Sequence, residues 1–266
     1  MSQGRTTDSH ASRWDRPIVA AALAGIVVLS WLYLVRMHLV PMALQVPEMD
    51  AIAMASMPAP SWTAGYFVAT LLMWVVMMIG MMVPSAAPTV LLFAALQRHR
   101  APASPRGPYA GIALFLAGYL GAWTAFSVVA TLAQWRLSIA GLLTSDLIGS
   151  GSLGGALFVA AGLYQLTPLK NACLEHCQSP AGFLVRYWGS GTIAPLLLGA
   201  RHGAYCLGCC WMLMLLLFVF GVMNLLWVAA LGIFVLIEKL APPRPLFGKI
   251  SAAVMILVGG VLLASG

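Results

Sequence analysis

Long stretches without a formal charge constrain this chain more than any other feature. Three of them, of 47, 29 and 36 residues, lie between Asp50 and Arg98, between Arg106 and Arg136, and between Arg201 and Glu238. About 20 apolar residues cross a bilayer as a helix, so each stretch is long enough for at least one span. The chain is 61% apolar and only 8% charged, whereas an ordinary soluble domain carries about 25% charge. We therefore predict an all-α fold, a polytopic transmembrane helix bundle, in place of a soluble enzyme or a disordered chain.

The apolar runs indicate about seven spans, at roughly 18–39, 64–84, 109–134, 152–167, 203–222, 224–239 and 247–265. Residues 1–16 are interpreted as a polar N-terminal tail and residues 17–266 as a single transmembrane helical domain. The second run stays apolar past Pro84 and Pro88 as far as Gln97, which predicts a kinked and over-long helix. Residues 190–200 are also apolar and predict either a helical extension or an interfacial segment.

The basic residues indicate the orientation. Under the seven-span interpretation, 12 of the 14 Lys and Arg residues fall on one side of the membrane. Such a bias marks the cytoplasmic side, so we expect the N-terminus inside, the C-terminus outside and the cytoplasmic (inner) membrane as the location. The net charge is +7, but the sequence has no run of five like charges. This argues against a nucleic-acid partner and leaves the lipid bilayer as the expected partner.

Methionines form the first candidate site. Met77 and Met81 share one helical stripe with Met73, and Met78 and Met82 form a neighbouring stripe. Nine of the fifteen methionines lie between residues 42 and 82. Thioethers are soft, neutral ligands that favour Cu(I). The alternative is that these methionines fill irregular gaps between helices.

Cysteines form the second candidate site, and all five lie within 38 residues. Cys173 and Cys177 are spaced to share a helical face, as are Cys206 and Cys210, with Cys209 close by. On the predicted cytoplasmic side a structural disulfide is disfavoured, so metal binding or redox chemistry is the better interpretation. Small buried hydrophobic side chains remain the simpler alternative.

Two histidines, His176 and His202, lie within the cysteine groups and are candidate ligands. His38, at the outer end of the first span, is a candidate to join the outer methionines. Glu238 and Lys239 close the sixth span and are interpreted as an ion pair at the interface. No glycine-rich phosphate loop, haem attachment motif or Ser/His/Asp spacing is present, so we do not expect an enzyme.

The sequence also resembles a known family, the predicted metal-binding integral membrane proteins of bacteria and archaea, which are sometimes described as copper chaperones. The resemblance covers roughly residues 60–240. It rests on the segments Trp74–Ser85, Tyr164–Cys177 and Gly203–Trp211, the last continuing to Gly221–Asn224. Gly80 stands where alanine is commoner in the family. The resemblance implies metal binding.

These observations together predict an integral membrane protein that handles a soft metal, with Cu(I) favoured and zinc as the other candidate. The metal would be transferred, transported or delivered to a partner such as a metallochaperone or a membrane cuproenzyme. One alternative is a membrane thiol–disulfide oxidoreductase that uses Cys206, Cys209 and Cys210. Another is a zinc ion that clamps the cysteine segments together for purely structural reasons, which would leave the methionines unused.

Overall fold

The structure, a computed structural model, describes residues 7–44, 62–100, 107–144, 147–148, 151–222, 224–241 and 245–265. Its longer helices are α1 (Thr7–Leu44), α3 (Ala64–Arg100), α4 (Gly107–Ile139), α5 (Gly151–Gln165), α8 (Ala194–Leu215), α10 (Leu225–Leu240) and α11 (Pro245–Ser265). The shorter elements are β1 (Leu143–Thr144), β2 (Leu147–Ile148), α6 (Pro168–Gln178), α7 (Pro180–Tyr187) and α9 (Leu217–Phe220). The predicted all-α bundle is thus confirmed, with one antiparallel pair of two-residue strands as the departure from it.

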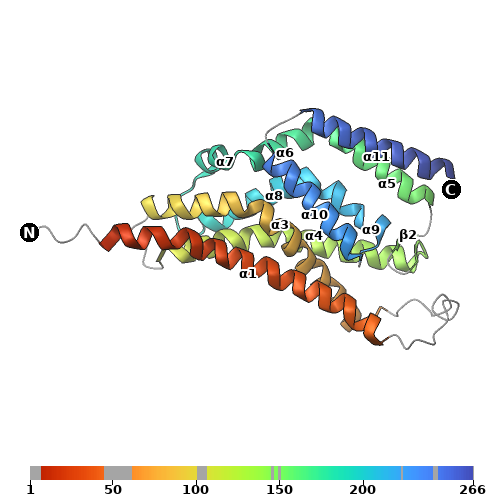
Figure 1. Cartoon of the computed structure of the whole chain (residues 1–266), viewed down its shortest axis with the longest axis horizontal. Coiled ribbons are helices and arrows are strands. Elements are labelled where there is room, and N and C mark those ends of the chain that lie inside the picture. The colour runs from red at the N-terminus through yellow and green to blue at the C-terminus, as the bar shows by residue number, and fades with distance from the viewer. Residues whose placement is uncertain are drawn as a thin grey trace, which may run out of the picture.

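The helices run back and forth along one axis, and the start of α1 lies at the opposite end of the bundle from the end of α11 (Figure 1). Among the described residues, five segments are long and apolar enough to cross a membrane, and the pair α5 and α6, bent by 65°, makes a possible sixth. The predicted spans at 152–167 and 224–239 correspond to α5 and α10, which have only 15 and 16 residues. At 1.5 Å per residue, helices of this length reach about 23 Å, short of a hydrocarbon core of about 30 Å. The described residues therefore contain five candidate spans, or six with the bent pair, whereas seven were predicted.

Several helix boundaries differ from the apolar runs. α1 begins at Thr7, so the predicted tail is helical from that residue onward. α8 begins at Ala194, so residues from 194 onward extend the fifth predicted span. α3 is 37 residues long and contains Pro84 and Pro88, and it changes direction along its length in Figure 1. The over-long helix is confirmed, and its bend is the effect expected of prolines that remove backbone hydrogen bonds.

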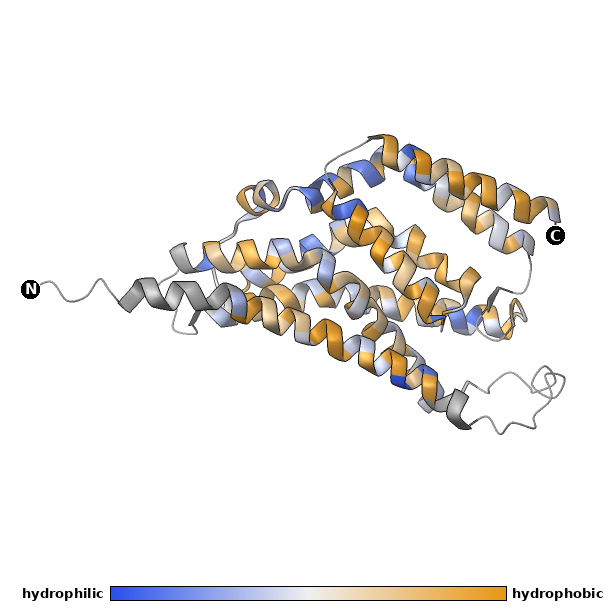
Figure 2. Ribbon diagram, in the orientation of Figure 1, coloured by the Kyte–Doolittle hydropathy of each residue, from blue (hydrophilic) through white to orange (hydrophobic). Residues whose placement is uncertain are grey.

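Many large apolar side chains are exposed on the helices, and Figure 2 shows mostly apolar residues along α10 and α11. On α11 one exposed stripe consists of Leu246, Ile250, Val254, Leu257 and Val261. In a soluble protein so large an apolar surface would mark a docking site. On a helix of membrane-spanning length it is the surface that contacts lipid.

Glycines set two close helix crossings. A Cβ at Gly118 of α4 would lie 2.0 Å from the Leu196 carbonyl oxygen of α8, and one at Gly199 would lie 1.9 Å from the Phe115 carbonyl oxygen. A similar approach joins α5 and α11, where a Cβ at Gly155 would lie 2.8 Å from the Gly259 carbonyl oxygen. Small residues at such contacts are the usual device for packing helices in lipid. The first crossing fixes the position of α8, which carries three cysteines.

Candidate metal centre

Four thiols meet between α6 and α8. Cys206, Cys209 and Cys210 occupy one face of α8 and are almost completely buried. Cys177 of α6 is buried as well, and its thiol lies near enough to interact electrostatically with those of Cys206 and Cys209. Cys210 interacts with the same two thiols. All five cysteines of the chain are free, so the structure gathers sulfur donors without joining any of them.

Cys173 lies at the edge of this thiol cluster. It is half-buried on α6, and a Cβ at Gly208 of α8 would lie 2.8 Å from its sulfur. The predicted helix that carries Cys173 and Cys177 is present as α6. It begins with Pro168 and is capped by Thr167, whose side-chain oxygen accepts a hydrogen bond from the Lys170 backbone N–H. Gly208 therefore allows α6 to approach α8 closely enough for Cys177 to reach the cluster.

A buried lysine and a buried tyrosine complete the surroundings of Cys206. Lys239 Nζ of α10 donates to Cys206 Sγ at 2.8 Å and lies 3.9 Å from Cys210 Sγ and 3.4 Å from Ser85 Oγ. The Tyr119 hydroxyl donates to the Met82 carbonyl oxygen at 3.0 Å and lies 3.1 Å from Cys206 Sγ. An ammonium group this close can act as the counter-ion of a thiolate, the form in which cysteine binds a metal.

The sequence interpretation missed Lys239 as a group of this site. It treated Lys239 and Glu238 as an interfacial ion pair, and this was wrong. Adjacent residues on a helix point about 100° apart, so Glu238 instead pairs with Lys170 while Lys239 faces the thiols. The sequence did offer a signal for Lys239, which is an ionisable residue at the end of an apolar run. Ionisable groups inside a membrane protein are commonly part of a functional site.

The thiols are gathered but not arranged as a finished metal site. Within the described ranges, no three His, Cys, Asp or Glu side chains form a group that could hold an ion as it stands. The thiols of Cys209 and Cys210 each donate to the Cys206 carbonyl oxygen, both at 3.0 Å. This is the geometry of protonated thiols, and loss of the proton removes the bond that directs each sulfur toward the backbone. The donor set itself, soft sulfur in a dry site, fits Cu(I) and also zinc.

His202 lies one helical turn before Cys206. It is buried, and its Nδ1 has no hydrogen-bond partner. Its ring is surrounded by Phe115, Tyr119 and Phe183, at centroid distances of 6.1, 5.7 and 5.0 Å. An unpartnered buried nitrogen is costly, so His202 remains a candidate ligand on the side of the site toward α4.

His176 is held by other contacts. Its ring stacks on Tyr205 with centroids 4.1 Å apart and planes 4° apart. Its Nδ1 lies 2.8 Å from the Ala172 carbonyl oxygen. The structure thus gives His176 a packing role between α6 and α8 and does not bring it into the thiol cluster.

The four predicted methionine ligands of α3 face the interior of the bundle. Met77, Met78, Met81 and Met82 of α3 are at most 3% exposed. A Cβ at Gly232 of α10 would lie 3.5 Å from Met81 Cγ, and the backbone of Met82 is linked to Cys206 through Tyr119. The methionine stripes therefore end beside the thiol cluster. The outer methionines Met49, Met54 and Met57 lie outside the described residues, as does the side chain of Met42.

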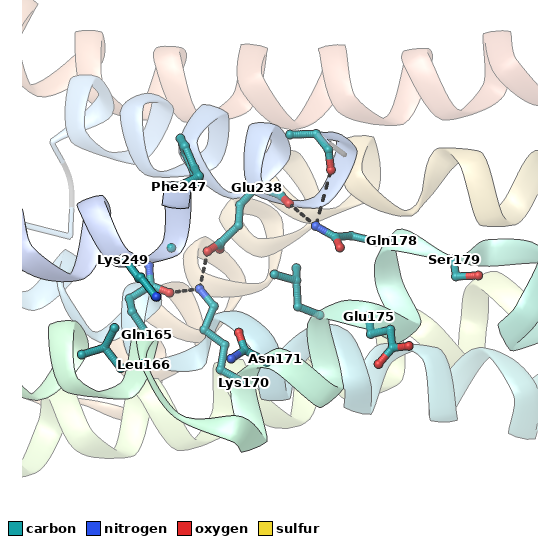
Figure 3. A pocket seen from close by; sticks show the side chains of 13 residues that line it. Gln165, Leu166, Lys170, Asn171, Glu175, Gln178, Ser179, Glu238, Phe247 and Lys249 are labelled. Atoms are coloured by element: carbon teal, nitrogen blue, oxygen red, sulfur yellow. Dashed lines mark hydrogen bonds and ion pairs between the residues drawn. The ribbon is translucent and has the colours of Figure 1, made fainter. Parts of the chain in front are cut away.

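A polar cavity adjoins the site on the other face of α6. It measures about 590 Å³ and is lined by residues of α5, α6, α10 and α11. Lys170 lies at its centre, donating to Glu238 Oε1 at 2.5 Å and to Gln165 Oε1 (Figure 3). Gln178 Nε2 donates to the Glu238 carbonyl oxygen at 2.9 Å. The ion pair thus links α6 to the end of α10, directly beside Lys239.

Breaking this ion pair should destabilise the protein strongly. Lys170 and Glu238 side chains are only 2% and 4% exposed, so Lys170→Met leaves a buried carboxylate unpaired. We expect a loss of about 3–5 kcal/mol in the free energy of unfolding. The measurement is thermal or denaturant unfolding of the detergent-solubilised protein.

The double variant Lys170→Met/Glu238→Met is the matched control. Replacing both partners of a buried pair by apolar groups is often neutral, so the double variant should recover most of the stability that the single variant loses. A single variant as stable as the wild type would mean that the pair is hydrated in the membrane and contributes little.

Fold and site together define a class: an all-helical membrane protein with a buried cluster of soft sulfur ligands. A family model, PpoB2, described as copper chaperone, matches residues 71–262. The chain belongs to this family, whose match includes α8 and every cysteine and most of α3. No curated protein and no solved structure matches it.

Proposed function

We propose that this protein binds Cu(I) at the thiol cluster of Cys177, Cys206, Cys209 and Cys210 and passes it on to a partner. The observation that carries the proposal is the meeting of these four buried thiols at the end of two buried methionine stripes. Cu(I) is the metal for which both thiolates and thioethers are good ligands. The family description as copper chaperone supports the same metal.

The charge of the surroundings is compatible with a monovalent ion held by two thiolates. Two thiolates with one Cu(I) carry a net charge of −1, and the Lys239 ammonium, 2.8 Å from Cys206 Sγ, brings the sum to zero. Neutral assemblies are the ones that a low-dielectric interior accepts at least cost. A zinc ion reaches the same balance only when it binds three thiolates.

The arrangement also suits exchange of the metal. More soft donors are present than Cu(I) needs, and α3 carries further neutral ligands on the methionine stripe whose last member, Met82, has its backbone linked to Cys206 through Tyr119. The ion can therefore change partners one ligand at a time. We propose that the methionines accept copper from the predicted outer side and that the cysteines bind it near the predicted cytoplasmic end. In this proposal copper moves from the outer side toward the cytoplasmic end, and its acceptor is a metallochaperone or a membrane cuproenzyme.

Two alternatives make different demands on the same residues. A thiol–disulfide oxidoreductase needs access for the partner's sulfur, and the thiols of Cys206, Cys209 and Cys210 are at most 1% exposed. A structural zinc clamp between α6 and α8 would use the cysteines and leave the methionines as packing. The methionines therefore decide between copper handling and the clamp.

The test replaces Met77, Met78, Met81 and Met82 by leucine. Leucine keeps nearly the same volume and apolarity, so each change should cost less than about 1.5 kcal/mol. We expect the variant to remain folded in the membrane and to keep its thiol-bound zinc capacity, but to lose copper occupancy. The measurement is metal content by elemental analysis under reducing conditions, after loading with Cu(I) or with zinc. The matched control is Met255→Leu on α11. Unchanged copper stoichiometry and affinity in the quadruple variant would return these methionines to the role of packing.

A further inference from the structure

A second group of soft ligands lies near the other end of the bundle. Met37 and His38 of α1 and Met73 and Met77 of α3 line one small cavity. Its remaining walls are aliphatic side chains of α1, of α10 and of the segment before α10. Along α10, Val228 in this cavity and Lys239 at the thiols are 11 residues apart, which corresponds to about 16 Å. The cavity is therefore separate from the thiol cluster.

The ligand types select the occupant. Three thioethers and one imidazole are neutral, and both groups bind Cu(I). No carboxylate and no ammonium group lines this cavity in the described part of the chain. A hard ion such as Mg²⁺ or Ca²⁺ requires oxygen ligands and finds none among these side chains.

Size and charge narrow the choice further. The cavity measures about 10 Å³, which is roughly the space for one water-sized occupant, so it admits a single ion and no small organic molecule. With neutral ligands the whole charge of the ion is buried. The solvation penalty grows with the square of the charge, so a divalent ion costs about four times as much as a monovalent one.

We propose that Met37, His38, Met73 and Met77 form a second, monovalent soft-metal site that receives Cu(I) before it reaches the cysteines. The proposal rests on the proposed function for the identity of the ion. It adds a separate site, formed between α1 and α3, with its own ligands. Met77 belongs both to this site and to the stripe that continues toward Met81, so an ion leaving the cavity has its next thioether one helical turn away.

The test uses Ag(I), a monovalent soft ion without redox chemistry, on the full-length protein in detergent. Wild type is compared with His38→Leu/Met73→Leu, with Cys206→Ser/Cys209→Ser, and with Met255→Leu as the matched control. We expect two classes of bound Ag(I) in the wild type. The His38→Leu/Met73→Leu variant should lose one equivalent, or bind it at least tenfold more weakly, and keep the thiol class. The cysteine variant should show the reverse.

The two proposals fail in different ways. Identical Ag(I) titrations for wild type and the His38→Leu/Met73→Leu variant would overturn the second site and leave the thiol cluster untouched. A different result would overturn the proposed function and keep this site. In it, the His38→Leu/Met73→Leu variant loses the class of Ag(I) that is not bound by thiols, while neither the wild type nor any variant binds Cu(I) at its cysteines. His38→Gln alone, at a half-buried position of α1, repeats the test with minimal effect on folding and is expected to weaken the same class.

Discussion

Replacing Cys206 by serine is expected to abolish most of the Cu(I) binding. Cys206 is the thiol with the most contacts to the rest of the site, because it meets Cys177, Lys239 and Tyr119. A hydroxyl is a poor ligand for a soft ion, and the Lys239 ammonium then faces a neutral group. We expect the copper affinity to fall at least a hundredfold, measured by competition with a Cu(I) chelator under reducing conditions. Cys209→Ser should behave similarly.

Cys173→Ser is the matched control for this experiment. Cys173 lies at the edge of the cluster and is half-buried, so its loss should change the affinity by less than a few fold. Cys173 was predicted as a ligand equal to Cys177, and the comparison tests that prediction directly. Equal losses in both variants would place Cys173 in the coordination shell. Wild-type binding in a variant without any cysteine would overturn the thiol site altogether.

Replacing Gly118 by alanine is expected to destabilise the protein strongly. The new methyl carbon would lie 2.0 Å from the Leu196 carbonyl oxygen and 2.7 Å from the Ala200 nitrogen, both backbone atoms of α8. Backbone atoms cannot rotate away as a side chain can, so α4 and α8 must move apart. We expect the free energy of unfolding to fall by about 3 kcal/mol or more. The measurement is thermal unfolding in detergent.

Gly121→Ala serves as the control because it lies three residues further along the same helix. A Cβ at Gly121 meets nothing within 4 Å, and alanine favours helix by up to about 1 kcal/mol relative to glycine. This variant should be as stable as the wild type or slightly more so. If Gly118→Ala were equally harmless, the close crossing of α4 and α8 would be wrong, and the placement of the α8 cysteines with it.

The sequence was sufficient to predict the helical class and the shared face of the α8 cysteines because both depend on local patterns. Uncharged runs of adequate length require helices in lipid, and cysteines at i, i+3 and i+4 share a face wherever the helix lies. The extra length of α3 was predicted for the same reason. The count of seven spans was too high because it included the short apolar runs 152–167 and 224–239, and their helices α5 and α10 have only 15 and 16 residues.

Contacts between distant segments could not be predicted in this way. Periodicity shows that Lys239 and Glu238 lie on different faces of α10, but it does not show that Cys206 and Lys170 are the groups those faces meet. His176 was predicted from its place between two cysteines, yet its partner is Tyr205, supplied by another helix. Met37 and Met73 became candidate ligands with His38 only once α1 and α3 had been placed side by side.

Helix α6 carries two attachments at once. Its Cys177 reaches the thiols of α8, and its Lys170 is paired with Glu238 of α10. Lys170 and Cys177 lie seven residues apart on this 11-residue helix, which is about two helical turns. Under the proposed function, a copper ion bound through Cys177 would hold α6 against α8, and undocking α6 would remove that ligand and open the buried ion pair in the same motion. An acceptor that moved α6 away from α8 would then reach the ion and weaken its binding in a single event. The contacts of α6 that retain copper would also be the contacts through which it is released.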